Sequence, residues 1–164
     1  MIADLTGAHK RMTLLWFSVL SAPLLIGIAL TAMVMVGGYT APAMLLPEEQ
    51  LRTAALGAMA LMLICSRPLR NIILSPSAIA ARPLQGAATD SDANTSAIGK
   101  TQASMFMLLG MLDAVSMIVV ALCLIQADYQ LALLNGTYTL VLAVIAKPDF
   151  ATLIRETVSQ LHRA

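Results

Sequence analysis

Four long stretches of apolar residues, separated by short polar segments, dominate the pattern of this chain. The stretches 13–36 and 130–146 contain no charged residue, and 102–126 contains one. An α-helix rises about 1.5 Å per residue, so roughly 20 apolar residues cross a hydrocarbon core of about 30 Å. We therefore predict an all-α integral membrane protein with transmembrane helices at about 13–36, 52–74, 102–126 and 130–146.

The second and fourth spans need further argument. The uncharged part of the second span, 53–66, is short, so this helix must continue past Arg67 and Arg70, whose side chains can snorkel toward the headgroups. A re-entrant or interfacial helix is the alternative for this segment. Few residues separate the third span from the fourth, which predicts an antiparallel hairpin.

The polar segments predict the orientation of the helices. Residues 75–101 form a polar loop, and the tail 147–164 contains an amphipathic pattern over 150–161 that is typical of a short helix on the membrane surface. Basic residues mark the cytoplasmic side of a membrane protein. They gather near the N-terminus, in this loop and in the tail: Lys10, Arg11, Arg67, Arg70, Arg82, Lys100, Lys147, Arg155 and Arg163. We expect one membrane domain, 1–164, with both termini and the loop cytoplasmic, in a bacterial inner membrane or its equivalent.

Composition supports a membrane protein and argues against several other classes. The chain is 59% hydrophobic and 12% charged, whereas a soluble domain is about 45–50% apolar and about 25% charged. No basic patch is dense enough to predict nucleic-acid binding. Cys65 and Cys123 lack the paired spacing of a metal site, and His9 and His162 lie outside the spans. We expect no metal, no cofactor and no enzymatic activity.

One charged residue, Asp113, falls in the middle of the third span. A charge at that depth costs roughly 2.5–3.5 kcal/mol and often belongs to an ion or proton pathway. Gly110 and Ser116 lie one turn away on the same helix face. Gly110 leaves room for a close neighbour, and the Ser116 hydroxyl can hydrogen-bond the carboxyl. The alternative interpretation is structural: a neutral carboxyl that ties this helix to another.

The segment 110–122, Gly-Met-Leu-Asp-Ala-Val-Ser-Met-Ile-Val-Val-Ala-Leu, resembles the ion-carrying helix of ATP synthase subunit c, the rotor-ring proteolipid. Asp113 falls on the ion-binding carboxylate of that family, and the segment 80–83 resembles part of its polar loop. The resemblance implies a hairpin of the second and third spans, an oligomeric ring, and one proton carried by each Asp113. Gly57, in the small-residue segment 54–60, and Gly110 would serve helix packing. Ser116 is the one further polar ligand, which favours a proton over sodium.

Two functions follow from these patterns. The first is a subunit of a multiprotein membrane complex that translocates protons as a subunit c ring does, with Asp113 and Ser116 as ion-binding residues. The alternative is a structural subunit of a membrane machine, such as a secretion or conjugation channel or a respiratory or photosynthetic supercomplex. Both predict the lipid bilayer and other membrane subunits as partners, in a homo-oligomer or a hetero-complex.

Overall fold

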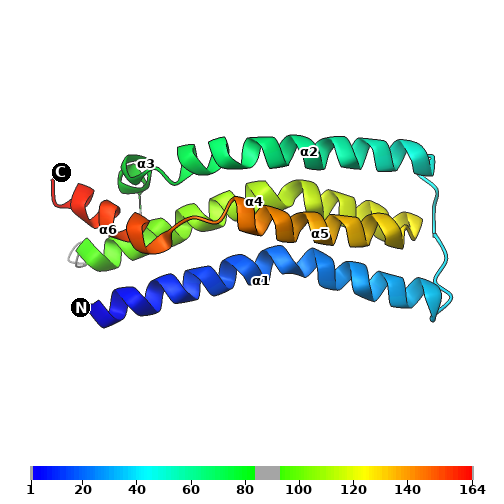
Figure 1. Cartoon of the computed structure of the whole chain (residues 1–164), viewed down its shortest axis with the longest axis horizontal. Helices are drawn as coiled ribbons and strands as arrows, with labels where there is room; N and C mark the ends of the chain where they lie inside the picture. The colour runs from blue at the N-terminus through cyan, green and yellow to red at the C-terminus, as the bar shows by residue number, and fades with distance from the viewer. Residues whose placement is uncertain (1, 84–92, 164) are drawn as a thin grey trace.

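The fold is a bundle of long helices. A computed structural model describes residues 2–83 and 93–163, with side chains from residue 7 onward. This part of the chain is helical and contains no strand. Its elements are α1 (Ile2–Met35), α2 (Glu48–Ile73), α3 (Pro76–Ala81), α4 (Ala93–Gln126), α5 (Tyr129–Ile145) and α6 (Phe150–Leu161) (Figure 1).

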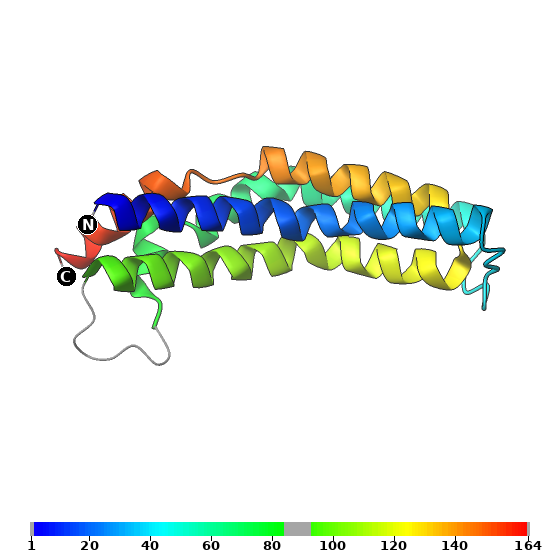
Figure 2. The ribbon, with the colours of Figure 1, turned by 90° about the horizontal axis from the view of Figure 1, so that it is seen from below.

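The four long helices lie side by side, and α1 and α4 run opposite to α2 and α5 (Figures 1 and 2). The α4–α5 pair lies between α1 and α2, and both outer helices pack against it. The predicted antiparallel hairpin of the last two long helices is therefore confirmed. Both chain ends, α3 and α6 lie at one end of the bundle, which we call the terminal end. The 36–47 connection and the α4–α5 turn lie at the other end, the turn end.

The contact between α1 and α5 is the most extensive in the bundle, because two glycines let the backbones approach closely. A Cβ atom added to Gly27 would lie 2.8 Å from the Ala132 carbonyl oxygen, and one added to Gly136 would overlap the backbone of Leu24. Toward the terminal end, the buried indole N–H of Trp16 donates a hydrogen bond of 2.9 Å to the carbonyl of Ala143. These contacts fix α5 against α1 along most of its length.

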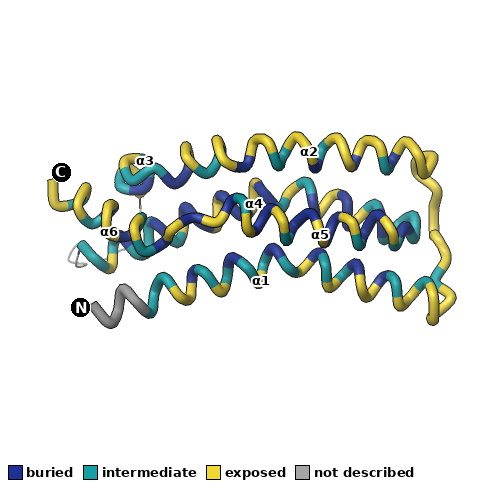
Figure 3. Tube along the Cα trace, in the orientation of Figure 1, coloured by how far each residue is buried: buried dark blue, intermediate teal, exposed yellow. Residues whose placement is uncertain are grey.

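Three helical segments are long and apolar enough to cross a membrane: Gly7–Met35, Glu48–Ile73 and Ala93–Gln126. Helix α5 has 17 residues, a rise of about 25 Å, and meets the same criterion only together with α6, from which it is bent by 49°. The described residues thus contain three or four candidate spans, which is compatible with a multi-pass membrane protein. Many large apolar residues of the bundle are exposed, among them Leu25 on α1 and Ile64 on α2. Figure 3 shows that both helices are exposed over much of their length.

The segment 75–101, predicted as a polar loop, is largely helical where the structure describes it. Ser75 caps α3 by accepting a hydrogen bond from the Ala78 amide, and Pro76 occupies the first helical turn, where it needs no donor. Helix α4 already begins at Ala93. Ile79 and Ala97 are fully buried, because α3 and the start of α4 pack against each other and against α6. Residues 84–92 of the predicted loop lie outside the described ranges.

The tail helix forms over the predicted residues, 150–161. The Asp149 carboxylate caps it by accepting hydrogen bonds from the amides of Ala151 and Thr152. The apolar side of α6 packs against α1, α3 and α4 of its own chain, and Ile154 is almost fully buried there. This side is therefore occupied by protein, and the helix does not rest on the membrane surface with a free apolar face.

Candidate functional site

Asp113 lies at the border between the packed and the outward sides of α4. Its neighbours one turn away are buried on one side, Leu109 and Ser116, and exposed on the other, Gly110 and Met117. The residue itself is half-buried. Its Oδ1 atom is buried and has no hydrogen-bond partner among the described residues. A polar atom in this position is costly unless a ligand, a proton or water satisfies it.

Ser116 is engaged with a different partner from the one that the sequence suggested. The Asn135 side-chain amide on α5 donates to the Ser116 hydroxyl at 2.9 Å and to the Ser116 carbonyl at 3.2 Å. Both residues are fully buried. The pair joins α4 to α5, and the predicted hydrogen bond between the Ser116 hydroxyl and Asp113 is not found among the described contacts. An ion-binding role for Ser116 stays a prediction.

The antiparallel register of α4 and α5 brings a tyrosine beside Asp113. From the Ser116–Asn135 contact, one turn toward the terminal end leads to Asp113 on α4 and to Tyr138 on α5. The hydrogen bonds between Asn135 and Ser116 set this register. Tyr138 is buried, and neither its Oη atom nor Asn135 Oδ1 has a partner in the described part of the chain. We call Asp113, Ser116, Asn135 and Tyr138 the intramembrane polar cluster.

Asn135 and Tyr138 were not predicted as site residues from the sequence. A signal for both was present, because they are polar residues spaced three apart in an uncharged run and so share one helix face. An amide inside a membrane helix usually bonds to a neighbouring helix. No sequence pattern fixes which helix lies beside Asp113, so neither residue could be assigned to its surroundings.

The two glycines predicted to serve helix packing do not do so within one chain. Gly57 and Gly110 are exposed, and an added Cβ atom would meet no described atom within 4 Å. The close approach occurs instead at Gly27 and Gly136, between α1 and α5. Packing of Gly57 or Gly110 against another subunit stays a prediction.

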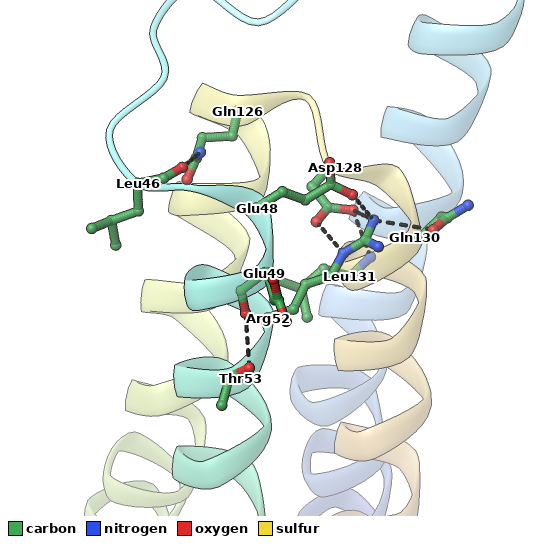
Figure 4. A network of polar contacts seen from close by, with 9 residues as sticks. All are labelled: Leu46, Glu48, Glu49, Arg52, Thr53, Gln126, Asp128, Gln130 and Leu131. Atoms are coloured by element: carbon green, nitrogen blue, oxygen red, sulfur yellow. Dashed lines mark hydrogen bonds and ion pairs between the residues drawn. The ribbon is translucent and has the colours of Figure 1, made fainter.

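A second polar network closes the turn end of the bundle (Figure 4). Arg52 on α2 donates to both carboxylate oxygens of Asp128 in the α4–α5 turn, at 2.9 and 3.0 Å, and to Gln130 at 3.0 Å. Glu48 lies one turn before Arg52 and forms an ion pair with it at 2.6 Å. The Asp128 carboxylate also caps α5 by accepting from the Leu131 amide at 3.0 Å. The network ties α2 to the α4–α5 turn.

Two opposing effects set the charge of Asp128. Burial disfavours its ionised form, but the hydrogen bonds from Arg52 and the Leu131 amide outweigh burial and lower the pKa of the carboxyl below its usual value. Asp128 is therefore ionised at neutral pH. Since Asp128 and Arg52 pair their charges and hydrogen bonds with each other, we interpret this network as structural: it holds α2 against the α4–α5 turn.

Metal binding finds no support in the described residues, which contain no group of three or more His, Cys, Asp or Glu side chains placed to hold an ion.

Comparison of the chain with protein-family models, with curated proteins and with solved structures gave no match in any of the three. The resemblance of the segment around Asp113 to subunit c stays a prediction.

Proposed function

We propose that this chain is a membrane-spanning subunit of a multiprotein complex and that Asp113 takes up and releases a proton there. The observation that carries the proposal is the buried, unpartnered Oδ1 atom of Asp113 within an apolar helix. The residues from Asp113 to Gln126 rise about 20 Å, which puts the carboxyl deep in the hydrocarbon core. Ionisable groups at such depth usually serve transport.

The surroundings of the carboxyl favour a proton over a metal cation. A hard cation such as sodium is held by several oxygen ligands together, whereas a proton needs one acceptor. Ser116 already accepts a hydrogen bond from Asn135, so its hydroxyl is partly committed. Tyr138 places one polar group beside Asp113 that can donate to its ionised form.

The resemblance to subunit c extends this proposal to a ring of copies. Helices α2 and α4 pack together, as the implied hairpin requires. Gly110 leaves the outward surface of α4 open one turn from Asp113. Gly57 likewise leaves the outward surface of α2 open. A second copy approaching these surfaces would lie against the exposed edge of the carboxyl. In such a ring the proton would be bound while Asp113 faces lipid and released at an aqueous half-channel of a partner subunit.

A hydrophobic carbodiimide tests the proton-carrying role, because it reacts with neutral carboxyls in apolar surroundings. We expect the reagent to label Asp113 in membranes, faster as the pH is lowered, and to block ion movement by the complex. The exposed acids Glu49 and Glu156 are an internal control within the same chain. Peptide mapping by mass spectrometry locates the label. An inert Asp113 would contradict the proposal.

The second candidate is a structural subunit, and the surface of α2 favours it. This helix packs only against α3, α4 and α5 among the described elements, and its other side is a long apolar surface containing Leu56, Leu61, Ile64 and Ile72. Such a surface can receive helices of other subunits as well as lipid. Labelling of Asp113 without any loss of transport would favour this function. Native mass spectrometry of the complex in mild detergent would give the copy number and the partners.

A further inference from the structure

A groove runs along the surface between α1 and α5 at the terminal end of the bundle. Its outer end is basic, with His9 and Lys10 on α1 and Lys147 after α5. Its inner part is mostly apolar, with Leu14, Phe17 and Leu140, and the two serines Ser18 and Ser21 also line it. A smaller hollow, lined by both Lys147 and Asp149, leads from this end toward the start of α6. The groove thus changes from charged to apolar along its length.

The two lysines at the outer end are available to an anion. Lys10 and Lys147 are exposed, and neither forms an ion pair with a described residue. The Lys147 Nζ atom lies 5.5 Å from the centre of the Phe17 ring, so the cation is held over the start of the apolar part. Because its ammonium group has no ion-pair partner among the described residues, Lys147 can bind an anionic ligand.

The acid next to Lys147, Asp149, offsets only part of the positive charge of the two lysines. Asp149 accepts hydrogen bonds from the amides of Ala151 and Thr152 and from the Thr152 hydroxyl. These hydrogen bonds, the one from the Thr152 hydroxyl first, lower the pKa of its carboxyl and hold its charge against the N-terminus of α6. The outer end of the groove keeps a net positive charge.

The whole groove, from its basic end inward, has about the length of one membrane leaflet. From Lys10 to Ser21, which also lines the groove, α1 rises about 16 Å, and half of a hydrocarbon core of about 30 Å is about 15 Å. Leu14 is 69% exposed, so this wall opens sideways to whatever surrounds the bundle. An acyl chain fits a groove of this length, whereas an extended peptide would have to leave its backbone polar groups unpaired at that depth.

We infer that this groove binds one anionic phospholipid, with its phosphate against Lys10 and Lys147 and an acyl chain along Leu14, Phe17 and Leu140. The inference rests on the proposed membrane placement of the bundle and is independent of Asp113. The cytoplasmic leaflet is the anionic one, and the terminal end carries most of the basic residues. Charge and hydrophobicity therefore match the ligand at both ends of the groove.

Native mass spectrometry of the complete protein in detergent tests the inference, with added phosphatidylglycerol or phosphatidylcholine of the same acyl chains. We expect phosphatidylglycerol to bind more tightly. Since each lysine near an anionic surface contributes about fivefold, Lys147→Gln should reduce that preference about fivefold, and Lys147→Gln with Lys10→Gln should abolish it. Ser18→Trp, a substitution in the groove lining that leaves the charge unchanged, should weaken binding of both lipids.

Arg155→Gln is the matched control, because Arg155 is an exposed cation on α6 at the same end and does not line the groove. It should leave the preference intact. Equal binding of the two lipids to the unaltered protein, or an equal loss with Arg155→Gln, would overturn the inference. Displacement of phosphatidylglycerol by millimolar inorganic phosphate would overturn it too, since it would reveal a simple anion site. Release of the protein from membranes by alkaline carbonate would instead refute the membrane placement.

Discussion

At the scale of single residues, Asp113 combines a buried, unpartnered oxygen with an exposed helix edge. We predict that Asp113→Asn inserts and folds as well as the original chain but loses carbodiimide labelling and ion movement. The asparagine amide has nearly the same shape as the carboxyl but cannot ionise, so the substitution removes the ability to bind and release a proton. Asp113→Lys should fail to accumulate, because a lysine near the midplane costs roughly 3 kcal/mol. Membrane extraction and thermal unfolding in detergent measure both. Loss of assembly with asparagine would favour a structural role.

Ala127, which follows α4, has a φ angle of +54°, a conformation that costs an L-residue roughly 1–2 kcal/mol. We predict that Ala127→Gly stabilises the fold by about 1 kcal/mol or less, because glycine adopts this conformation freely but loses more entropy on folding. Thermal unfolding in detergent measures the change. Gly38→Ala is the matched reverse substitution, since Gly38 has a φ of +67° and open space around it. It should destabilise. A lower unfolding temperature for Ala127→Gly would contradict the prediction.

At the scale of elements, the α1–α5 contact depends on Gly136. We predict that Gly136→Ala destabilises the bundle by about 1–3 kcal/mol, because its Cβ would overlap the Leu24 backbone and force the two helices apart. Gly110→Ala is the control, since its Cβ meets open space within the chain. It should leave the isolated chain as stable as before. If copies pack against α4 as proposed, it should weaken self-association, which native mass spectrometry detects. Equal unfolding temperatures of the two variants would contradict the packing role of Gly136.

The tie between α2 and the α4–α5 turn depends on Arg52. We predict that Arg52→Gln destabilises the chain by about 1–2 kcal/mol at pH 7, because two hydrogen bonds to a buried carboxylate are lost. The loss is no larger because Arg52 is partly exposed, so that solvent screens the ion pair. Glu48→Gln should cost much less, since this ion pair is exposed. Unfolding in detergent measures both variants.

The same tie predicts a dependence on pH. The folded pKa of Asp128 lies below its unfolded value of about 3.9, so its contribution to stability is present above that value and is lost as the pH falls through the folded pKa. The difference in stability between the original chain and Arg52→Gln should therefore shrink below about pH 4. A difference that stays constant from pH 7 to pH 3 would show that the pair does not stabilise α2.

At the scale of the whole molecule, both chain ends, α3 and α6 share one end of the bundle. We predict that they share one side of the membrane. In a chain with Cys65→Ala and Cys123→Ala, single cysteines at Ser77 and Ser159 should have the same accessibility to an impermeant reagent in sealed vesicles. A cysteine at Thr40, in the connection at the turn end, should have the opposite accessibility. All three positions are exposed. Opposite accessibility of Ser77 and Ser159 would refute the shared side.

The helices themselves follow from local chemistry that the sequence carries. The long apolar runs, the short connection between 126 and 130 and the amphipathic pattern over 150–161 are local features, and they predicted the long helices, the hairpin of α4 with α5 and the bounds of α6. Helix lengths were less predictable, because the start of α4 is stabilised by packing against α3 and α6 rather than by an apolar run. The position of Asp113 in an apolar helix was likewise determined by the sequence alone.

Which sides of the helices meet was decided by the tertiary structure. In a soluble protein the apolar side of a helix is the packed side, but in a membrane both the lipid-facing and the protein-facing sides are apolar. The pattern therefore could not distinguish Gly27 and Gly136, which bring α1 and α5 together, from Gly57 and Gly110, which face outward. Nor could it pair Ser116 with Asn135. The partners of polar groups depend on the register between helices, which only packing of the whole bundle fixes.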